Sequence, residues 1–283
     1  MNTLPPLETL YTAERGPALP LPPELAALYG RLEFPPHPGR PYVIGNFVSS
    51  LDGVVALNTP GTKTGGGEIS GFNEHDRMVM GLLRAIADAV IVGAGTLRSV
   101  PNHRWIALYI YPPLVQVYQQ LRANLGITEP PLNVIVTAQG AVNLALPVFQ
   151  SGEVPVLIVT TPAGAEQLRK QAIPSWVQIS VADGEGAVSA GAVLEAIRRL
   201  RDCNLILTEG GPKLMSNFFA ERLLDELFLT LAPQVVGRDG TTERPGFVDG
   251  QRFAPEQPVW GMLVDVKRAS THLFLRYAFE SVR

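Results

Sequence analysis

Two short stretches of the chain carry the residue types best suited to binding a phosphorylated ligand. The first, Gly93-Ala94-Gly95-Thr96, follows the apolar run Ala89–Val92, and its glycines would let the backbone approach a phosphate closely. Arg98 stands where a Gly-x-Gly-x-x-Gly fingerprint has its third glycine, so the stretch indicates a phosphate loop but only weakly a Rossmann domain. Arg98 could bind the phosphate or lie exposed in the first turn of a helix.

The second stretch, Glu209-Gly210-Gly211-Pro212, joins the apolar run Leu205–Thr208 to the start of a predicted helix. Here the free amide groups and the positive end of the helix dipole would converge, which makes the better anion site of the two. Glu209 would face a sugar or an amine of the ligand. The alternative is a tight turn with a solvated carboxylate. We expect the two stretches to be neighbours in the fold and to bind one diphosphate together.

Two further stretches lie near the carboxyl ends of predicted strands, where open α/β sheets bind their ligands. Ser49-Ser50-Leu51-Asp52-Gly53 follows the apolar run Tyr42–Val48 and, taken alone, is a turn. The segment Pro60–Gly71 is too rich in glycine to form a rigid element, so it is either an idle loop or a mobile lid.

The composition argues against several other functions. The chain has 23 Lys and Arg against 26 Asp and Glu, so nothing indicates a surface that binds nucleic acid or membranes. One cysteine, Cys203, and four scattered histidines argue against a metal site and suit a reducing compartment. No apolar run approaches the roughly 20 residues that cross a bilayer. We therefore expect a cytoplasmic protein without a metal that binds a small molecule.

The pattern of elements from Pro41 onward predicts an α/β fold, because short β-branched apolar runs alternate with helical patterns. Buried strands are expected over Tyr42–Val48, Ala89–Val92, Asn133–Thr137, Val156–Thr160, Val177–Val181 and Leu205–Thr208, with antiparallel additions at Asp225–Ala232 and Thr271–Glu280. Helices are expected after Asn73, which can cap one with Asp76 at the third position, and over Gly191–Arg201 and Pro212–Arg222.

Two regions have less regular patterns. Residues 1–40 are rich in proline and predict an arm with one short helix, Pro23–Leu32, preceding a domain over residues 41–283. The arm either drapes over the core or is a disordered tail. The aromatic-rich segment Trp105–Leu125 either covers its own core or contacts another subunit.

In this order and spacing, the motifs resemble the reductase domain of the bifunctional riboflavin-biosynthesis deaminase/reductase, a family with a dihydrofolate-reductase-like fold. The resemblance runs from about Arg40 to Phe279 and includes Ser50-Leu51-Asp52-Gly53, Leu83-Arg84-Ala85-x-x-Asp88-Ala89, Gly93-x-Gly95-Thr96, Glu209-Gly210-Gly211-Pro212 and Asp225-Glu226-Leu227 with Ala232-Pro233. It implies a three-layer α/β/α fold around a mixed, mostly parallel sheet with antiparallel C-terminal strands. The zinc-deaminase signature is absent, so the chain resembles a free-standing reductase.

The resemblance implies an NADPH-dependent reductase that opens the ribose of 5-amino-6-(5-phosphoribosylamino)uracil to an imine-like form and delivers hydride to its C1. Arg84 would clamp the phosphate, Glu209 would face the pyrimidine or ribose, and Gly66 and Arg104 would also contact the substrate. The residues implied for the cofactor are Ser49, Glu68, Gly93, Gly95, Thr96, Arg98, Gly210, Gly211, Pro212, Lys213 and Leu214. Asp52, Glu209 or water would donate the proton. The Gly210–Gly211 bond would be cis.

Two departures from the family pattern keep other functions open. The usual Asp-Pro-x-Leu-Thr-x-Arg run is replaced by Ser99-Val100-Pro101-Asn102-His103-Arg104, and Val54 replaces a basic residue. One alternative is a reductase of this fold acting on another heterocyclic or imine substrate. A second is a protein that binds a nucleotide without turning it over. Members of the family are commonly dimers, so we expect a homodimer.

Overall fold

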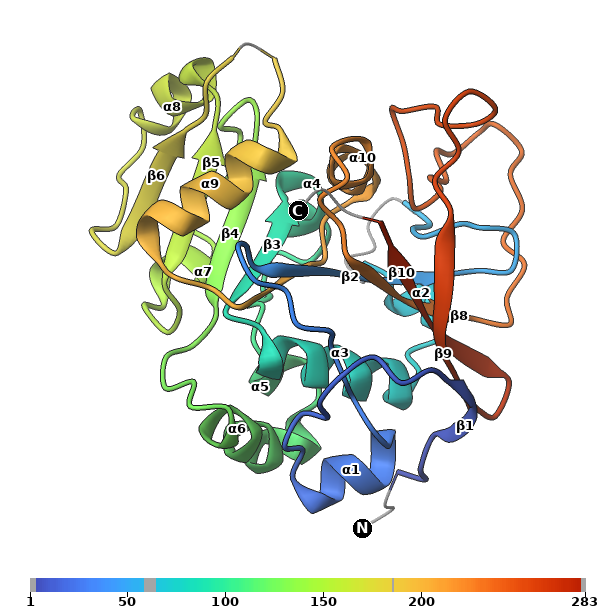
Figure 1. The fold of residues 1–283 in the computed structure, drawn as a ribbon. Helices are drawn as coiled ribbons and strands as arrows, with labels where there is room; N and C mark the ends of the chain where they lie inside the picture. Colours follow the sequence, from blue (N-terminus) through green and yellow to red (C-terminus); the bar gives the residue numbers. More distant parts are fainter. Residues whose placement is uncertain (1–3, 59–64, 185, 281–283) are drawn as a thin grey trace.

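A single mixed sheet of ten strands organises the molecule (Figure 1). The computed structural model describes residues 4–58, 65–184 and 186–280. The strands are β1 (Glu8–Thr12), β2 (Tyr42–Ser49), β3 (Ala89–Gly93), β4 (Leu132–Thr137), β5 (Val156–Thr160), β6 (Val177–Val181), β7 (Leu205–Thr208), β8 (Glu226–Leu231), β9 (Gly261–Ala269) and β10 (His272–Phe279). Their order in the sheet is β1-β9-β10-β8-β2-β7-β3-β4-β5-β6.

The helices connect and cover these strands. They are α1 (Pro23–Tyr29), α2 (Gly67–Ser70), α3 (Glu74–Ile86), α4 (Ala94–Ser99), α5 (Ala107–Ile110), α6 (Val115–Asn124), α7 (Pro147–Gln150), α8 (Pro162–Leu168), α9 (Ala190–Leu200) and α10 (Pro212–Ala220), with a 3₁₀ turn at Pro112–Leu114. Apolar side chains of α9 and α10 form one core against the sheet, and those of α3 and α6 form another. The two cores make the predicted three layers.

The strand directions confirm the mixed sheet and correct one detail. From β8 to β6 neighbouring strands run parallel, whereas β1, β9 and β10 run antiparallel to their neighbours. The strand expected as an antiparallel addition at 225–232 is therefore parallel to β2 and antiparallel only to β10. The reason is the helix before it, because α10 is a crossover and returns the chain to the same end of the sheet.

Helix α3 forms as its capping signal predicts and presents several functional side chains. The side chain of Asn73 accepts a hydrogen bond from the backbone N–H of Asp76 at 3.1 Å, which satisfies a free amide of the first turn. The stripe that contains Val79, Leu82 and Leu83 is fully buried. Arg84 lies in the last turn of this helix and is buried as well.

The arm lies on the core over its described residues. Strand β1 pairs with β9, and α1 buries Leu25 and Tyr29 against the rest of the protein. The arm is therefore part of the same packed structure as the sheet. The amino-acid composition changes near residue 40, but the packing between the two segments is continuous.

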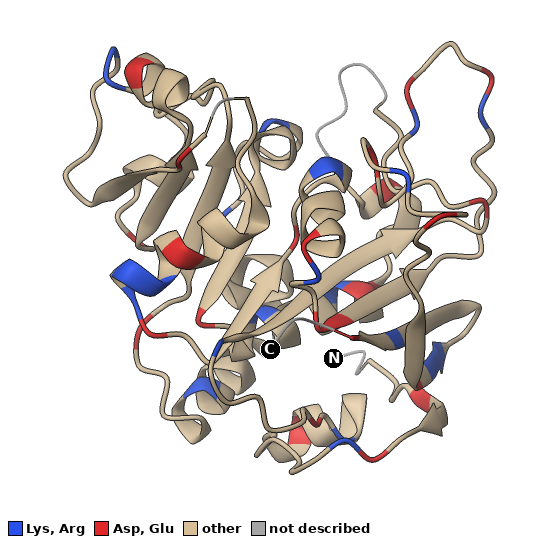
Figure 2. Ribbon diagram, turned by 45° about the horizontal axis from the view of Figure 1, so that its top comes forward, with Lys and Arg blue, Asp and Glu red and all other residues tan. Residues whose placement is uncertain are grey.

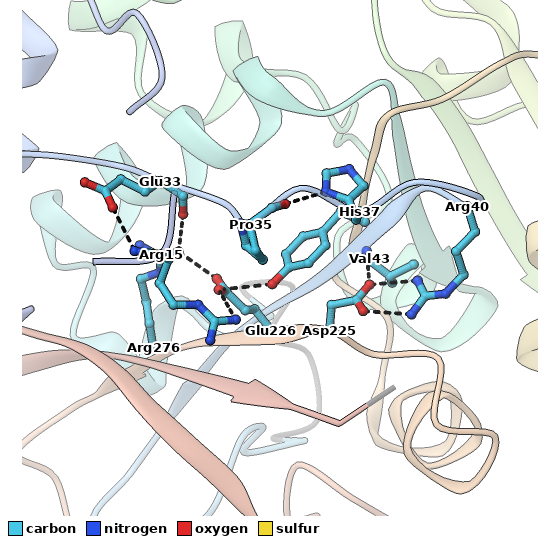
Figure 3. Close-up of polar contacts among 10 residues, drawn as sticks. Arg15, Glu33, Pro35, His37, Arg40, Val43, Asp225, Glu226 and Arg276 are labelled. Carbon is cyan, nitrogen blue, oxygen red and sulfur yellow. Dashed lines mark hydrogen bonds and ion pairs between the residues drawn. The ribbon is translucent and has the colours of Figure 1, made fainter. Parts of the chain in front are cut away.

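Between the arm and the sheet lies a cluster of polar groups, which we call the arm network: Arg15 and Glu33 of the arm with Tyr42, Glu226 and Arg276 of the sheet (Figure 3). Arg276 donates to Glu226 Oε2 at 2.7 Å and to the Glu33 carbonyl at 2.9 Å, and Tyr42 Oη donates to Glu226 Oε1 at 3.1 Å. Beside it, Arg40 holds Asp225 through two hydrogen bonds of 2.8 and 2.7 Å. The arm network thus joins the arm to β2, β8 and β10.

The aromatic segment 105–125 covers the molecule's own core. Trp105, Tyr111 and Tyr118 are buried, and Tyr118 Oη donates to the Met78 carbonyl at 2.9 Å. A Cβ placed on Gly81 would lie 2.5 Å from Tyr118 Oη, so the approach of α6 to α3 requires glycine at this position.

Charged residues of both signs are interspersed around the molecule (Figure 2). In the parts of the chain that the structure describes, none of the helices has the length and apolar character needed to span a membrane. The same residues contain no group of three His, Cys, Asp or Glu side chains placed to hold a metal. Burial raises the pKa of Cys203 to about 12, so its sulfur is a thiol at neutral pH.

Candidate active site

A cavity of about 1280 Å³ opens at the carboxyl ends of the central parallel strands. Its walls include the ends of β2, β3 and β4 and the residues that follow β7. Open α/β sheets bind ligands at this location because the loops after adjacent parallel strands converge there. The cavity is large enough for a dinucleotide and a second small molecule together.

The two glycine stretches predicted to be neighbours meet in this cavity. Gly93 is the N-cap of α4, Gly211 is the N-cap of α10, and neither helix start has a side-chain cap. A Cβ built on Gly93 would lie 3.9 Å from the Gly211 amide nitrogen, and one built on Gly211 would lie 3.7 Å from Thr96 Oγ1. The predicted proximity is confirmed.

These glycines leave a cradle that fits a diphosphate. The nearest protein atom to a Cβ built on Gly95 is Arg98 Nη2 at 4.0 Å, so larger side chains would project into open space. The residues at the starts of α4 and α10 line that space together with the cations Arg98 and Lys213. Free backbone amides and the helix dipole at such helix starts attract anions. The chemistry of these donors suits the linked phosphates of a dinucleotide.

Farther along the wall, Arg84, His103 and Glu209 form a hydrogen-bonded group that we call the site cluster. Arg84 donates from Nε to Glu209 Oε1 at 2.9 Å and from Nη2 to Oε2 at 2.6 Å. The side chains of Arg84 and Glu209 are only 3% and 8% exposed. Two parallel charge-assisted bonds fix the carboxylate plane, so Glu209 presents defined lone pairs to the cavity.

His103 completes the site cluster as a neutral acceptor. Its Nε2 lies 2.6 Å from Arg84 Nη1, and a guanidinium can only donate, so Nε2 accepts. Burial, with the charges of Arg84, Arg104 and Arg77, lowers the pKa of His103 to about 2. The ring packs edge-on against Trp105, with centroids 5.3 Å apart. His103 therefore lies in the cavity wall, where it holds Arg84.

Asp76 is a second lining residue that sequence reasoning did not assign to the site. It is 5% exposed, and burial raises the pKa of its carboxyl group, with the charge of Glu209 adding to the effect. The spacing of Asp76 indicates that it points inward, because it precedes Val79 by three residues and Leu83 by seven and so shares the inward stripe of α3. Asp76 was predicted only as a position in the helix cap and therefore was not placed in the site.

Most of the predicted site residues line the cavity, and three do not. The lining contains Gly66, Glu68, Arg84, Gly93, Gly95, Thr96, Arg98, Glu209, Gly210, Gly211, Pro212, Lys213 and Leu214. Ser49, Asp52 and Arg104 lie outside it. Ser49 Oγ donates to the Ser50 carbonyl at 2.9 Å. Arg104 pairs with Glu153 at 2.8 Å and covers the ring of Tyr109.

Asp52 has bonds that oppose the proposed role of proton donor. Its carboxylate accepts from Ser50 Oγ at 2.7 Å and from the amides of Val236 and Gly237 at 3.0 and 2.8 Å. These hydrogen bonds hold the pKa of Asp52 well below its usual range, so it is ionised at neutral pH. Its place in the structure is to fix the turn after β2 against the loop after β8.

Two further expectations concern the Gly210–Gly211 peptide bond and the lid Pro60–Gly71. The cis peptide bond in the described residues joins Ala254 to Pro255, so the Gly210–Gly211 bond is trans and that expectation is wrong. Gly211 enters α10 from an extended conformation, and the turn needs no cis bond, which would cost about 3 kcal/mol. Of the proposed lid Pro60–Gly71, residues 60–64 lie outside the described residues, while 65–68 and Ser70 line the cavity.

The chain is similar in sequence to known proteins. Residues 41–256 match the family model of the RibD C-terminal domain. A 2,5-diamino-6-ribosylamino-4(3H)-pyrimidinone 5′-phosphate reductase of Methanothermobacter thermautotrophicus is 31% identical over 82% of this chain and 94% of its own. The riboflavin biosynthesis protein RibD of Chlamydia trachomatis is 28% identical over 71% of this chain, which spans 48% of that protein.

A solved structure supports the fold. The pyrimidine reductase-like protein of Corynebacterium diphtheriae superposes with a TM-score of 0.65 at 20% identity, covering 86% of this chain and 93% of its own. At that identity the likeness concerns the fold alone. The predicted fold class, α/β of the dihydrofolate-reductase-like type, is confirmed.

Proposed function

Because this chain belongs to the RibD C-terminal domain family, we propose that it is an NADPH-dependent reductase of a ribosylaminopyrimidine 5′-phosphate in riboflavin biosynthesis. The observation that carries the proposal is one cavity lined by two neighbouring helix starts without side-chain caps and by a buried carboxylate held by arginine. The first group suits a dinucleotide and the second an aminopyrimidine.

The chain's own residues would bind and orient the cofactor. The amides at the starts of α4 and α10 would hold the diphosphate, with Arg98 and Lys213 adding positive charge. When bound, the reduced nicotinamide supplies the hydride. NADPH is the form expected from the family resemblance, and titration with NADPH and NADH tests that preference directly.

Glu209 is the proposed contact for the substrate's amino groups. Its bonds to Arg84 use one lone pair on each oxygen, which leaves others for N–H donors in the cavity. Arg84 uses three of its five N–H donors on Glu209 and His103 and is 3% exposed, so we propose that another cation meets the phosphate. Arg77 fits that role, because it lines the cavity, is exposed, and has no side-chain hydrogen bond to the described residues.

Two compounds are candidates for the substrate. The family resemblance favours 5-amino-6-(5-phosphoribosylamino)uracil. The name of the Methanothermobacter relative, which matches this chain over 94% of its own length, favours the 2,5-diamino-pyrimidinone. We expect oxidation of NADPH with one of these ribotides, followed by loss of dihydronicotinamide absorbance and by isolation of the ribityl product. Tight NADPH binding without turnover of either ribotide would favour a nucleotide-binding protein instead.

Gly95→Val tests the cradle. The added side chain meets no protein atom closer than 4.0 Å at its Cβ, so the fold should persist while the space for the diphosphate fills. We expect NADPH affinity to fall at least about tenfold, equivalent to ~1.4 kcal/mol, in a calorimetric titration. Ala123→Val, at an exposed position of α6, is the matched control and should bind normally. Unchanged affinity in Gly95→Val would contradict the assignment.

We also propose a homodimer, as the family resemblance implies. The aromatic segment around Tyr109 is a poor contact, because Arg104 covers the Tyr109 ring and Glu153 accepts from its hydroxyl. Trp260, which precedes β9, and Met262, near its start, are 82% and 59% exposed and are better candidates. Light scattering on the protein and on Trp260→Ser tests this, with a dimer expected for the first and a monomer for the second.

A further inference from the structure

We propose that the carboxyl group of Asp76 is the acid that delivers a proton to the substrate nitrogen during reduction. The inference rests on the proposed function, since it presumes that a C=N bond is reduced in this cavity. It stands on the position of Asp76 in the lining, on its burial, and on the pairing or the exposure of the other carboxyl groups.

Asp76 is the best enclosed of the acidic residues that line the cavity. The others in the described lining are Glu68, Glu209, Glu243 and Asp249. Glu209 is an acceptor in a bidentate pair with Arg84, and Glu243 is exposed. Glu68 and Asp249 are half-exposed, whereas Asp76 is 5% exposed. A proton held on Asp76 is therefore the one most protected from exchange with bulk water before the substrate binds.

The surroundings of Asp76 favour a neutral acid over a carboxylate. Burial raises the pKa of the Asp76 carboxyl group, and hydrogen bonds with the hydroxyls of Thr230 and Ser70 lower it by a smaller amount. The single hydrogen of the Ser70 hydroxyl is directed to the Gly67 carbonyl at 3.2 Å, so Ser70 can accept a hydrogen bond from a protonated Asp76. Burial has the largest effect on the pKa of Asp76 and favours the neutral acid, because it penalises the charged form.

Two titratable groups face Asp76 from other elements, and they act in opposite directions. Glu209, beyond β7, raises the pKa of Asp76 by repulsion, and His272, on β10, lowers it. His272 Nε2 lies 3.0 Å from the Ser70 carbonyl and Nδ1 lies 3.2 Å from Asn73 Nδ2. These contacts fix the turn between α2 and α3, and with it the position of the Asp76 side chain.

The proposed step balances in atoms and electrons. Ring opening of the ribosylamine gives a C1=N imine and a free hydroxyl. Two electrons and one hydrogen reach C1 as hydride from the reduced nicotinamide cofactor, which is thereby oxidised. The π bond breaks toward nitrogen, which takes the proton from Asp76 and becomes the amine. Asp76 is left as a carboxylate and recovers its proton from water.

Asp76→Asn tests the step, because it keeps the shape and removes the acid. We expect kcat to fall about 100-fold, as is typical for loss of a general acid, with NADPH affinity unchanged. In the native enzyme kcat should decline as pH rises through the pKa of Asp76, because the acid must be protonated. That decline should disappear in Asp76→Asn and return, shifted, in Asp76→Glu. Glu74→Gln, at an exposed acid of the same helix start, is the matched control and should behave as the native enzyme.

A second measurement needs neither cofactor nor substrate. Infrared spectroscopy of the free protein at neutral pH should show a protonated carboxyl band that is missing from Asp76→Asn and present in Glu74→Gln. Native turnover with unaltered kcat and pH profile in Asp76→Asn overturns the inference while leaving the proposed function intact. A protein that reduces neither ribotide, whatever its infrared spectrum, overturns the proposed function and the inference that rests on it.

Discussion

The arm network and the site cluster use the same chemistry in different surroundings. In each, a buried arginine holds a carboxylate, at 2.7 Å between Arg276 and Glu226 and at 2.6 Å between Arg84 and Glu209. Glu226 is fully enclosed, whereas Glu209 borders a cavity of about 1280 Å³. An enclosed pair can only join elements of the fold. A pair at a cavity wall also keeps lone pairs available to a ligand, so its partner arginine acts as a support.

The largest expected effect comes from breaking the enclosed pair. Glu226→Ala leaves Arg276 as a buried charge without its carboxylate, so the free energy of unfolding should fall by about 3–5 kcal/mol. Urea denaturation measures this. The matched control is Glu195→Ala, which removes an exposed carboxylate paired with Arg198 and Arg199 and should change stability little. If the two variants lost equal free energy of unfolding, burial of the ion pair would not determine how much stability its removal costs.

The corresponding change in the site cluster should separate activity from stability. Glu209→Ala should lower kcat/KM about 100-fold, because it removes the proposed acceptor for the substrate's amino groups. Its loss of stability should be smaller than that of Glu226→Ala, since water in the cavity can hydrate Arg84. Steady-state kinetics and urea denaturation on the same preparations give both values. Full activity in Glu209→Ala would contradict the proposal that the site cluster binds substrate while the arm network only stabilises the fold.

The smallest expected effect concerns the third member of the site cluster. The pKa of His103 is about 2 in the folded protein against 6.5 for an unperturbed histidine. Below pH 6.5 the unfolded chain binds a proton that the folded protein does not, so His103 makes stability fall as pH falls. The slope approaches ~1.4 kcal/mol per pH unit.

His103→Gln keeps an acceptor for Arg84 but cannot titrate. Its stability should therefore fall less steeply than that of the native protein between about pH 6.5 and pH 5, by urea denaturation at each pH. The same slope in both proteins would contradict the assignment of a neutral, buried imidazole.

The sequence predicts the residue ranges of the parallel strands well. It does not predict β9, and the reason is a buried ion pair. Strands β5 and β7 coincide with their predicted ranges, because buried parallel strands read as continuous apolar runs. Strand β6 also has its predicted range, but the expectation that it is buried is wrong, because it is the last strand of the sheet and only Val177 is buried. In β9 the inward residues Asp265 and Lys267 form a buried ion pair at 2.9 Å, which hides the apolar alternation. Strand β1 is missed because all of its residues are exposed and its pairing with β9 is a tertiary contact.

Some parts of the candidate site could be predicted from local sequence and others could not. The glycine stretches were predictable because each follows a strand, and the loops after adjacent parallel strands converge. The pairing of Arg84 with Glu209 spans 125 residues and leaves no local pattern. His103 needs the same long-range geometry, because the residue becomes an acceptor only once Arg84 is placed beside it.

Strand β1 also determines how the sheet ends. Without it, the nine-residue β9 would present its unpaired backbone groups to solvent, and an open edge of that length can recruit strands from other chains. The five-residue β1 takes the outer place, with an irregularity in register between Thr9 and Tyr11 and with Glu8 paired to Arg268. A chain trimmed to begin after Thr12 is therefore expected to aggregate on storage even where its cavity and its catalysis are intact.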